Sequence, residues 1–294
     1  MAEELVSIII TTYRRPVEIV RRAVESALNQ TYTPIEIYVV NDAPEDQELS
    51  KAIGDMLGAY GEEKIHYLIE EKNGGACKAR NDGIRASKGT FVTLLDDDDE
   101  MLPEKTALQL QGFTGEDVGM VYSPYYDVYG EKKFLRRSYT KSGDLLEDLL
   151  WRNCISSGSM SLIRREVFEQ CGYFDERFRS RQDHDLWLRI AQKYKINFVD
   201  VPITNRYVLS ECITSCNSAQ KQGFELIMEK YKDLYEGKRD LQNYRYAVMT
   251  KEWIARGEFK EAWQAYKKAL KIKKFSKYNL TQPVKGIGRY LLHR

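Results

Sequence analysis

The stretch TFVTLLDDDDEMLPEK, Thr90–Lys105, determines how the rest of the chain is interpreted. Its first six residues are apolar or β-branched, which predicts a short buried strand. Four aspartates and a glutamate follow at once, and Pro103 is suited to the first turn of a helix. Neighbouring carboxylates repel one another. The run therefore indicates either a solvated acidic turn or a site for a hard divalent cation, which takes oxygen ligands and often bridges phosphates.

A strand followed by a helix recurs three times before this stretch. The expected strands are Leu5–Thr12, Ile35–Val40 and Lys64–Ile69, and the expected helices are Glu18–Gln30, Glu45–Tyr60 and Cys77–Ser87. Strands that alternate with helices at this spacing favour βαβ units and a mainly parallel sheet covered on both faces. The acidic run then lies at the carboxyl end of a strand, where open α/β sheets bind ligands.

The second half of the chain is less regular. Short strands are expected within Gly119–Tyr129, at Ser159–Ile163 and at Ile196–Val201, and helices at Gly143–Trp151, Arg165–Cys171, Asp183–Lys193, Ser218–Glu236, Asp240–Arg256 and Lys260–Lys271. We therefore predict an α/β domain over residues 1–215, with a first half at about 1–103 and a second half at about 104–215. Residues 216–294 are expected to form a helical region whose last two helices pack as a hairpin.

Composition narrows the class of protein. The 294 residues carry a net charge of +1, and 43% are hydrophobic, which predicts a folded, soluble chain. The sequence has no apolar run of about 18 residues, and its start, MAEELVSIII, lacks the basic segment of a secretion signal. Five cysteines at irregular spacing, without a CxxC pair, disfavour a zinc site and a disulfide framework. We expect a cytoplasmic protein.

The charge is distributed unevenly. Residues 260–294 carry ten basic residues and one acidic residue, whereas the rest of the chain carries 35 basic and 43 acidic residues. The lysines of this tail are interleaved with aromatic and aliphatic residues, which is typical of a helix at a membrane interface. An anionic membrane surface is therefore one expected partner, and a solvated helix face is the alternative. Nucleic acid is not expected as a partner, because the body is acidic.

Five segments, in order along the chain, resemble the GT2 group of inverting glycosyltransferases. They are VSIIITTYRRP (Val6–Pro16), YVVNDAPED (Tyr38–Asp46), EKNGGACKARNDGIRASKG (Glu71–Gly89), FVTLLDDDDEMLPEK (Phe91–Lys105) and FDERFRSRQDHDLWLRI (Phe174–Ile190). The fourth segment is similar to the family's DXD segment and the fifth to its late ED motif. The resemblance implies a GT-A (Rossmann-like) fold, a mixed and mainly parallel sheet flanked by helices, here with a C-terminal helical extension.

The resemblance also implies an activity. A member of this family would be a metal-dependent hexosyltransferase that moves a sugar from a nucleotide-sugar to an acceptor hydroxyl by a single displacement with inversion. UDP is favoured over GDP and dTDP, and Mn²⁺ or Mg²⁺ is the implied cofactor. The implied acceptor is a saccharide or a lipid-linked saccharide in bacterial cell-surface polysaccharide or glycolipid synthesis. Such an acceptor would bring a peripheral enzyme to the inner face of the membrane.

The donor-side residues follow from the first three segments. The resemblance places Thr11, Tyr13 and Asp42 at the base and ribose of the donor. It brings Arg15 and Arg80 towards the donor phosphates, and a surface position is the alternative for both.

The acidic run supplies the implied metal site. Asp98 matches the second aspartate of DXD and is the implied metal ligand. Asp96 and Asp97 would contact the ribose or the water shell of the ion. The register within Asp96–Asp99 stays open by one residue.

The acceptor side depends on Asp183, the second residue of the ED motif, which here reads Gln182-Asp183. A carboxylate at the start of a helix can take the proton from an attacking hydroxyl, so Asp183 is the implied base. A helix cap is the alternative role, and Asp185 is a nearby competitor. His184 is expected to face solvent. The family's later Tyr-Arg-x-His stretch is absent, because NRYVLSECITS has no histidine and Arg206 is displaced from that pattern.

Two other functions remain open. One is a nucleotidyltransferase-like enzyme, and the other is a non-catalytic nucleotide-binding relative. The first usually begins with a glycine-rich loop, which VSIIITTYRRP lacks. The second is disfavoured because Asp42, Asp98 and Asp183 are all present.

Overall fold

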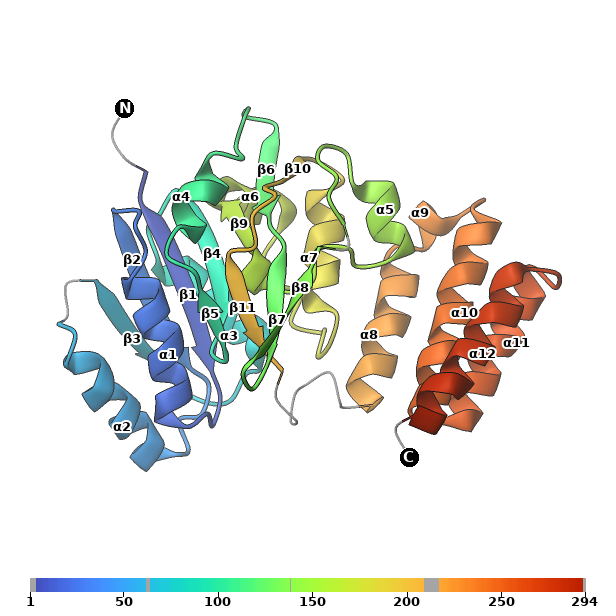
Figure 1. Cartoon of the computed structure of the whole chain (residues 1–294), viewed down its shortest axis with the longest axis horizontal. Helices are drawn as coiled ribbons and strands as arrows, with labels where there is room; N and C mark the ends of the chain where they lie inside the picture. Colours follow the sequence, from blue (N-terminus) through green and yellow to red (C-terminus); the bar gives the residue numbers. More distant parts are fainter. Residues whose placement is uncertain (1–3, 62–63, 138, 209–216, 293–294) are drawn as a thin grey trace. The chain divides into compact units, whose positions relative to one another are not determined.

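The four expected strands of the first half form four neighbouring strands of one seven-stranded sheet (Figure 1). Its strands, in spatial order, are β10 (Lys195–Phe198), β6 (Val118–Tyr122), β9 (Ser161–Arg164), β4 (Phe91–Asp96), β1 (Val6–Thr12), β2 (Ile35–Asn41) and β3 (Ile65–Ile69). Strand β9 runs antiparallel to β4 and β6, and the other pairs are parallel. The predicted mixed, mainly parallel sheet is therefore confirmed.

Helices cover both faces of this sheet. On one face, α1 (Val17–Leu28) and α2 (Gln47–Gly58) bury a cluster that includes Ile8 and Ile10 of β1. The other face is covered by α3 (Ala76–Ala86), because a Cβ at Gly83 would come within 2.6 Å of Ile9. Successive residues of β1 thus face opposite helices, which explains why Ile8, Ile9 and Ile10 in the middle of the strand are all apolar.

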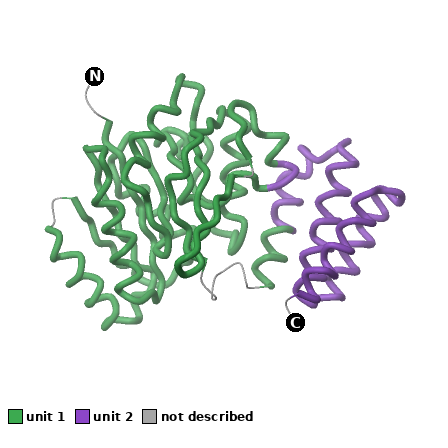
Figure 2. The backbone as a smooth tube through the Cα atoms, in the orientation of Figure 1, with its two compact units in different colours: residues 1–149, 153–224 green, residues 150–152, 225–294 purple. Residues whose placement is uncertain are grey.

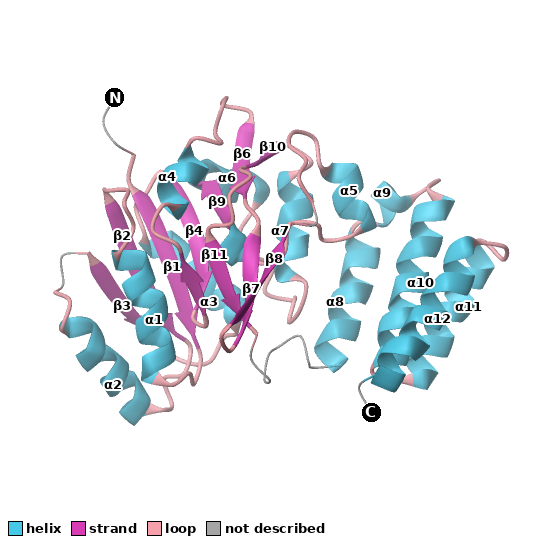
Figure 3. Cartoon of the chain, viewed as in Figure 1, coloured by secondary structure: helices cyan, strands magenta, loops and turns pink. Residues whose placement is uncertain are grey.

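A second sheet was not predicted. It has four strands, in the order β5 (Asp99–Met101), β11 (Thr204–Tyr207), β7 (Tyr125–Tyr129) and β8 (Lys132–Arg136) (Figure 3). Strand β5 begins inside the acidic run, and Asp99 pairs with Arg206 in its antiparallel register with β11. Polar strands of three to five residues have too little apolar periodicity to be recognised from sequence.

Helices α5 (Leu146–Trp151), α6 (Arg165–Cys171) and α7 (Gln182–Ile190) correspond to expected helices with shifted ends. The helix expected at Ser218–Glu236 is shorter, because α8 (Asn217–Lys230) ends at Lys230. The short helix α4 (Lys105–Leu110) follows Pro103, and the short 3₁₀ helix η1 (Gly158–Met160) was not expected.

The computed structural model describes residues 4–61, 64–137, 139–208 and 217–292. It divides into two compact units, of which unit 1 comprises residues 1–149 and 153–224, and unit 2 comprises residues 150–152 and 225–294 (Figure 2). The predicted domain boundary between residues 215 and 216 lies outside the described residues and stays a prediction. No helix of the described part is long and apolar enough to cross a membrane.

Unit 2 is built around three helices that follow the short α9 (Lys232–Tyr235). They are α10 (Arg239–Ala255), α11 (Phe259–Ile272) and α12 (Lys277–Leu292), and α10 packs against both others. Buried Asn243 of α10 donates to the Ala269 carbonyl of α11 at 2.8 Å and to Asn279 of α12 at 2.9 Å. The expected tail is therefore the third helix of a packed bundle.

Candidate active site

The acidic run is held by an arginine from the loop after β1. Arg15 donates from Nε to Asp97 Oδ1 at 3.1 Å and from Nη2 to Asp98 Oδ2 at 3.1 Å. Arg22 of α1 adds a hydrogen bond to the Asp98 carbonyl at 2.7 Å. These contacts place Arg15, which we expected near phosphates, directly against the aspartates. Arg22 was not predicted, because nothing in the sequence marks it among the charged residues of its helix.

The four aspartates are not equivalent. The side chains of Asp96 and Asp98 are 29% and 19% exposed, and that of Asp97 is 8% exposed. Asp99 is 1% exposed and belongs to β5. A ligand that enters from solvent therefore meets Asp96 and Asp98 more readily than the other two.

Burial perturbs the charge of this run. Burial raises the pKa of Asp97 to about 6, although Arg15 opposes the shift. The pKa of Asp98 is also raised, first by burial and then by the neighbouring Asp96. A bound cation favours the ionised form of such carboxylates and so offsets the effect of burial. The donor set also fits a hard cation, since Mg²⁺ is usually held by one or two carboxylates together with substrate phosphates.

Within the described residues, no group of three or more His, Cys, Asp or Glu side chains is arranged to hold a metal ion. An ion at Asp98 would thus complete its coordination with oxygens from water or from a bound phosphate.

Asp42 directly follows β2, which is separated by β1 from the strand β4 that leads into the acidic run. Its Oδ1 accepts from the Gly74 amide at 2.7 Å, and its Oδ2 accepts from the Gly75 amide at 2.8 Å and from Asn73 at 2.9 Å. Gly75 has a φ of 84°, a conformation that glycine adopts without strain. Asp42 thus fixes the loop that precedes α3, whatever further contact it makes with a ligand.

Thr11 and Tyr13 lie at the carboxyl end of β1. Thr11 is opposite Asp96 in the parallel register of β1 and β4. Tyr13 is 48% exposed, and the Arg14 guanidinium lies 5.4 Å from its ring centre. An exposed ring at the edge of the site is available to stack on a planar ligand.

Arg80 joins the two halves of the site. Its Nη2 lies 2.7 Å from Asp96 Oδ1, and its Nη1 lies 3.6 Å from Asp183 Oδ1. The guanidinium is buried, and it rests 5.4 Å from the ring of Phe174. Arg80 is thus an ion-pair partner of the candidate base, and its burial rules out the surface position that was the alternative. Its expected contact with phosphates stays a prediction.

Asp183 lies in the first turn of α7, after Arg181, which has a left-handed φ of 65°. Burial raises the pKa of Asp183 to about 6, with Arg80 lowering it and Asp96 raising it. A carboxylate whose pKa lies near neutrality is suited to accept a proton during a reaction. The side chain keeps 17% exposure, so a hydroxyl can approach it.

The neighbours of Asp183 serve the packing of α7. His184 was expected to face solvent, and this is wrong, because it is 1% exposed and its Nε2 lies 2.7 Å from the Leu149 carbonyl. Asp185, the competing base, is fully buried and paired with Arg189. Because it is buried and paired, Asp185 is not a candidate for the base.

The second sheet contributes a cation that the sequence did not assign. Arg206 of β11 donates to Asp127 Oδ1 at 2.8 Å from Nε, and its guanidinium lies 4.8 Å from the Tyr125 ring centre. Burial lowers the pKa of Arg206, but Tyr125, Asp127 and, last, buried Asp99 raise it above its ordinary value. Arg206 belongs to no recognisable sequence motif, so only the fold shows that it lies near the acidic run.

Comparisons with known proteins agree with this architecture. Residues 7–172 match the family described as Glycosyl transferase family 2. An uncharacterized glycosyltransferase of Rickettsia prowazekii is 35% identical over 244 residues, which cover 79% of this chain and 71% of that protein. The uncharacterized glycosyltransferase YwdF of Bacillus subtilis is 30% identical over 260 residues, which cover 84% of this chain and 90% of YwdF.

Solved structures show the same fold. TarS 1–349 of S. aureus superposes with a TM-score of 0.62 at 15% identity, and covers 98% of this chain and 92% of that one. The mannosyltransferase PcManGT from Pyrobaculum calidifontis, in complex with GDP-Man and Mn²⁺, gives a TM-score of 0.62 at 14% identity, with 99% and 88% covered. The chain therefore belongs to glycosyl transferase family 2 and is a glycosyltransferase with the GT-A fold.

Proposed function

We propose that this glycosyltransferase moves a sugar from a nucleotide-sugar, a UDP-sugar in the first instance, to an acceptor hydroxyl by single displacement with inversion. The observation that carries the proposal is the Arg80 guanidinium, which pairs with Asp96 on the donor side and Asp183 on the acceptor side. A carboxylate with a pKa of about 6 thereby lies beside the strand end that presents the acidic run.

The donor would bind across the carboxyl ends of β1, β2 and β4. In this proposal Tyr13 offers its exposed ring to the base, and Thr11 and Asp42 take the base and ribose. Asp42 would share oxygens that already bind the Gly74 and Gly75 amides, so the loop and the nucleotide would be held by one carboxylate. A relative in fold, TarS 1–349, was solved in complex with UDP-GlcNAc, which supports a nucleotide-sugar donor.

Asp98 would hold the metal ion, Mn²⁺ or Mg²⁺, and Asp96 and Asp97 would contact the ribose or the water around the ion. Arg15 keeps Asp97 and Asp98 in place from the side of β1. When bound, such an ion neutralises the diphosphate and stabilises it as a leaving group. The complex of PcManGT with Mn²⁺ supports a divalent metal in a protein of this fold.

The transfer itself needs one proton acceptor. As the acceptor oxygen forms its bond to the anomeric carbon, its proton passes to Asp183, and the bond from that carbon to the diphosphate oxygen breaks with the electron pair leaving on the phosphate. The attack comes from the side opposite the leaving group, so an α-linked donor gives a β-linked product. Arg80 would keep the Asp183 carboxylate oriented towards the acceptor.

The acceptor would be a saccharide or a lipid-linked saccharide in the synthesis of a bacterial cell-surface polysaccharide or glycolipid. The enzyme would act in the cytoplasm, with peripheral association at the inner face of the membrane. The relatives in Rickettsia prowazekii and Bacillus subtilis support a bacterial setting.

Release of the nucleoside diphosphate tests the proposal without an acceptor. UDP-, GDP- and dTDP-sugars would be incubated with the wild-type protein and Mn²⁺ or Mg²⁺. The variants Asp98→Ala and Asp183→Asn would be assayed in parallel. The control variant is Asp55→Asn, which replaces an exposed carboxylate on α2. We expect slow hydrolysis of one donor, lost in the first two variants and kept in the control. Failure of every donor to bind by calorimetry with either metal would overturn the proposal.

A further inference from the structure

The outer side of α12 carries an unpartnered row of aliphatic residues. We call this row the α12 stripe, and it consists of Leu280, Val284, Ile287 and Leu291, which are 72%, 68%, 50% and 65% exposed. Their spacing of four, three and four residues places them on one face of the helix. Phe275, just before the helix, is 87% exposed as well. An apolar row of this length on an exposed helix is a mark of a binding surface.

The opposite side of α12 is polar and tightly packed. Its buried residues are Asn279, Gln282 and Gly286. Asn279 accepts from Asn243 at 2.9 Å and donates to the Lys273 carbonyl at 2.7 Å. A Cβ at Gly286 would come within 2.8 Å of the Lys251 carbonyl, so the backbones of α10 and α12 meet there. The helix cannot turn about its axis to bury the stripe without breaking these contacts.

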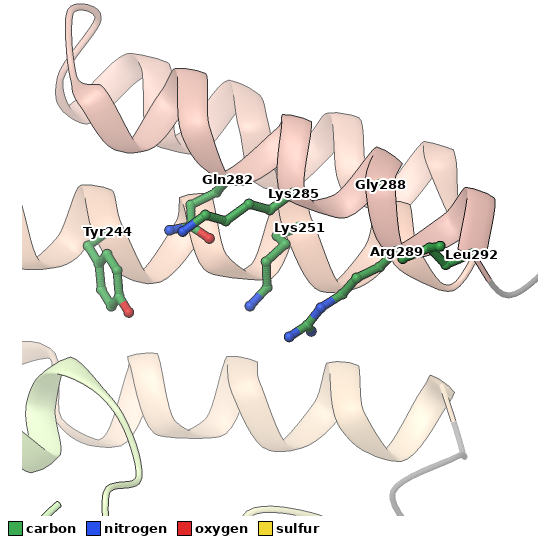
Figure 4. A pocket seen from close by; sticks show the side chains of 7 residues that line it. All are labelled: Tyr244, Lys251, Gln282, Lys285, Gly288, Arg289 and Leu292. Carbon is green, nitrogen blue, oxygen red and sulfur yellow. The ribbon is translucent and has the colours of Figure 1, made fainter. Parts of the chain in front are cut away.

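Positive charges predominate along α12 and the segment that precedes it. Residues 271–294 include seven lysines and arginines and no acidic residue. Lys277, in the first turn of α12, precedes Leu280 by three residues and lies on the side of the stripe, whereas Lys285 and Arg289 lie on the flank of the helix that faces α10. Figure 4 shows Lys285 and Arg289 extended to the same side as Lys251, where they line an open hollow of about 470 Å³. Glu252 binds Lys251 at 2.7 Å and lies 3.5 Å from Arg289, so it offsets part of this charge.

We propose that the α12 stripe docks on an anionic lipid surface, with α12 lying in the plane of the interface. A surface of this kind accepts aliphatic side chains among the acyl chains and cations among the headgroups, which matches both observations. A second copy of the chain is a poorer occupant, because pairing two such helices would bring like charges together. This docking assigns residues to the peripheral association proposed above and rests on that part of the proposed function. Its test is independent of the proposed reaction, since the docking uses only residues of unit 2.

Vesicle flotation of the full-length protein tests the docking. Vesicles of phosphatidylcholine alone would be compared with vesicles that also contain phosphatidylglycerol, at low and high salt. We expect binding to the anionic vesicles, weakened by salt and reduced at least about tenfold in the double variant Leu280→Ser with Ile287→Ser. The matched control is Phe134→Ser with Leu135→Ser on β8, two residues with 48% and 50% exposure, and it should bind like the wild type.

Other outcomes would overturn the docking. Equal binding by the stripe variant and the wild type, or no binding by the wild type, would do so. A dimer in sedimentation velocity that the stripe variant abolishes, without any vesicle binding, would assign the stripe to a second copy. If the stripe variant unfolds, Lys274→Gln with Lys277→Gln replaces it, and unchanged binding by that variant to anionic vesicles would count against the proposal.

Discussion

Acidification should switch off the chemical step by protonating Asp183. Burial raises the pKa of this carboxyl group to about 6, opposed by Arg80 and assisted by Asp96. At pH 7.5 about 97% of such a group is ionised and at pH 5 about 9%, so a rate that needs the carboxylate falls about tenfold. An aspartate with its ordinary pKa would lose less than about 10% over the same range.

The assay is donor hydrolysis at saturating donor and metal, with kcat followed from pH 5 to pH 8. Asp97 is the competing explanation, because burial raises its pKa to about 6 as well, with Arg15 opposing the shift. Asp97 lies on the donor side, so its protonation would weaken donor binding. Calorimetry of the donor at pH 5 and pH 7.5 separates the two, and we expect kcat to fall while the dissociation constant changes little.

Removal of Arg80 provides a second check. Arg80→Gln deletes the cation that lowers the pKa of Asp183, so the acid limb of the profile should move to higher pH. Arg80→Lys keeps a positive charge and should move it less. A kcat that stays flat down to pH 5, or a limb that is the same in all three proteins, would refute the reasoning.

Three shorter predictions concern the metal, a buried lysine and a glycine. Asp98→Ala should abolish the dependence of donor binding on Mn²⁺ while leaving the melting temperature within a few degrees, as measured by calorimetry and thermal unfolding. Burial lowers the pKa of Lys105 to about 7, so above that pH the unfolded chain holds a proton that the folded chain has lost. The free energy of unfolding, measured by urea titration, should therefore rise by about 2 kcal/mol from pH 7 to pH 9. The variant Lys105→Met should not show this rise. In Gly223→Ala the new Cβ would overlap the Ser180 carbonyl, which should cost about 1–3 kcal/mol of stability in the same titrations, and a variant as stable as the wild type would contradict the close approach.

The parallel core could be predicted because its strands contain runs of apolar and β-branched residues. Residues on both faces of β1 are buried, so Ile8, Ile9 and Ile10 all had to be apolar, and the run stood out. Strand β8 has no such signal, since all of its residues are exposed. Helix α12 was missed as a bundle helix because its buried side is polar, which inverts the usual pattern.

The sequence suggests which residues form the candidate site, but it does not show which side chains they contact. Arg15 binds Asp97 and Asp98, which lie 82 and 83 residues further along the sequence. A motif gives the position of an arginine along the chain, and only the fold decides which carboxylates it meets. Arg15 pairs with Asp97 and Asp98, and Arg80 pairs with Asp96 and Asp183. Contact of either arginine with the donor phosphates stays a prediction.

The acidic run belongs to two sheets at once, since Asp96 ends β4 and Asp99 begins β5. Asp97 and Asp98 are therefore the two residues that link β4 of the seven-stranded sheet to β5 of the four-stranded sheet, which also contains Arg206. A point substitution in this two-residue link changes one side chain. An inserted or deleted residue would shift the register of β5 by one residue and turn each of its side chains to the other face of the sheet. For the fold, this junction therefore tolerates a change of residue type better than a change of length, although Asp98 within it is the proposed metal ligand. A different acidic segment placed here must keep the same number of residues.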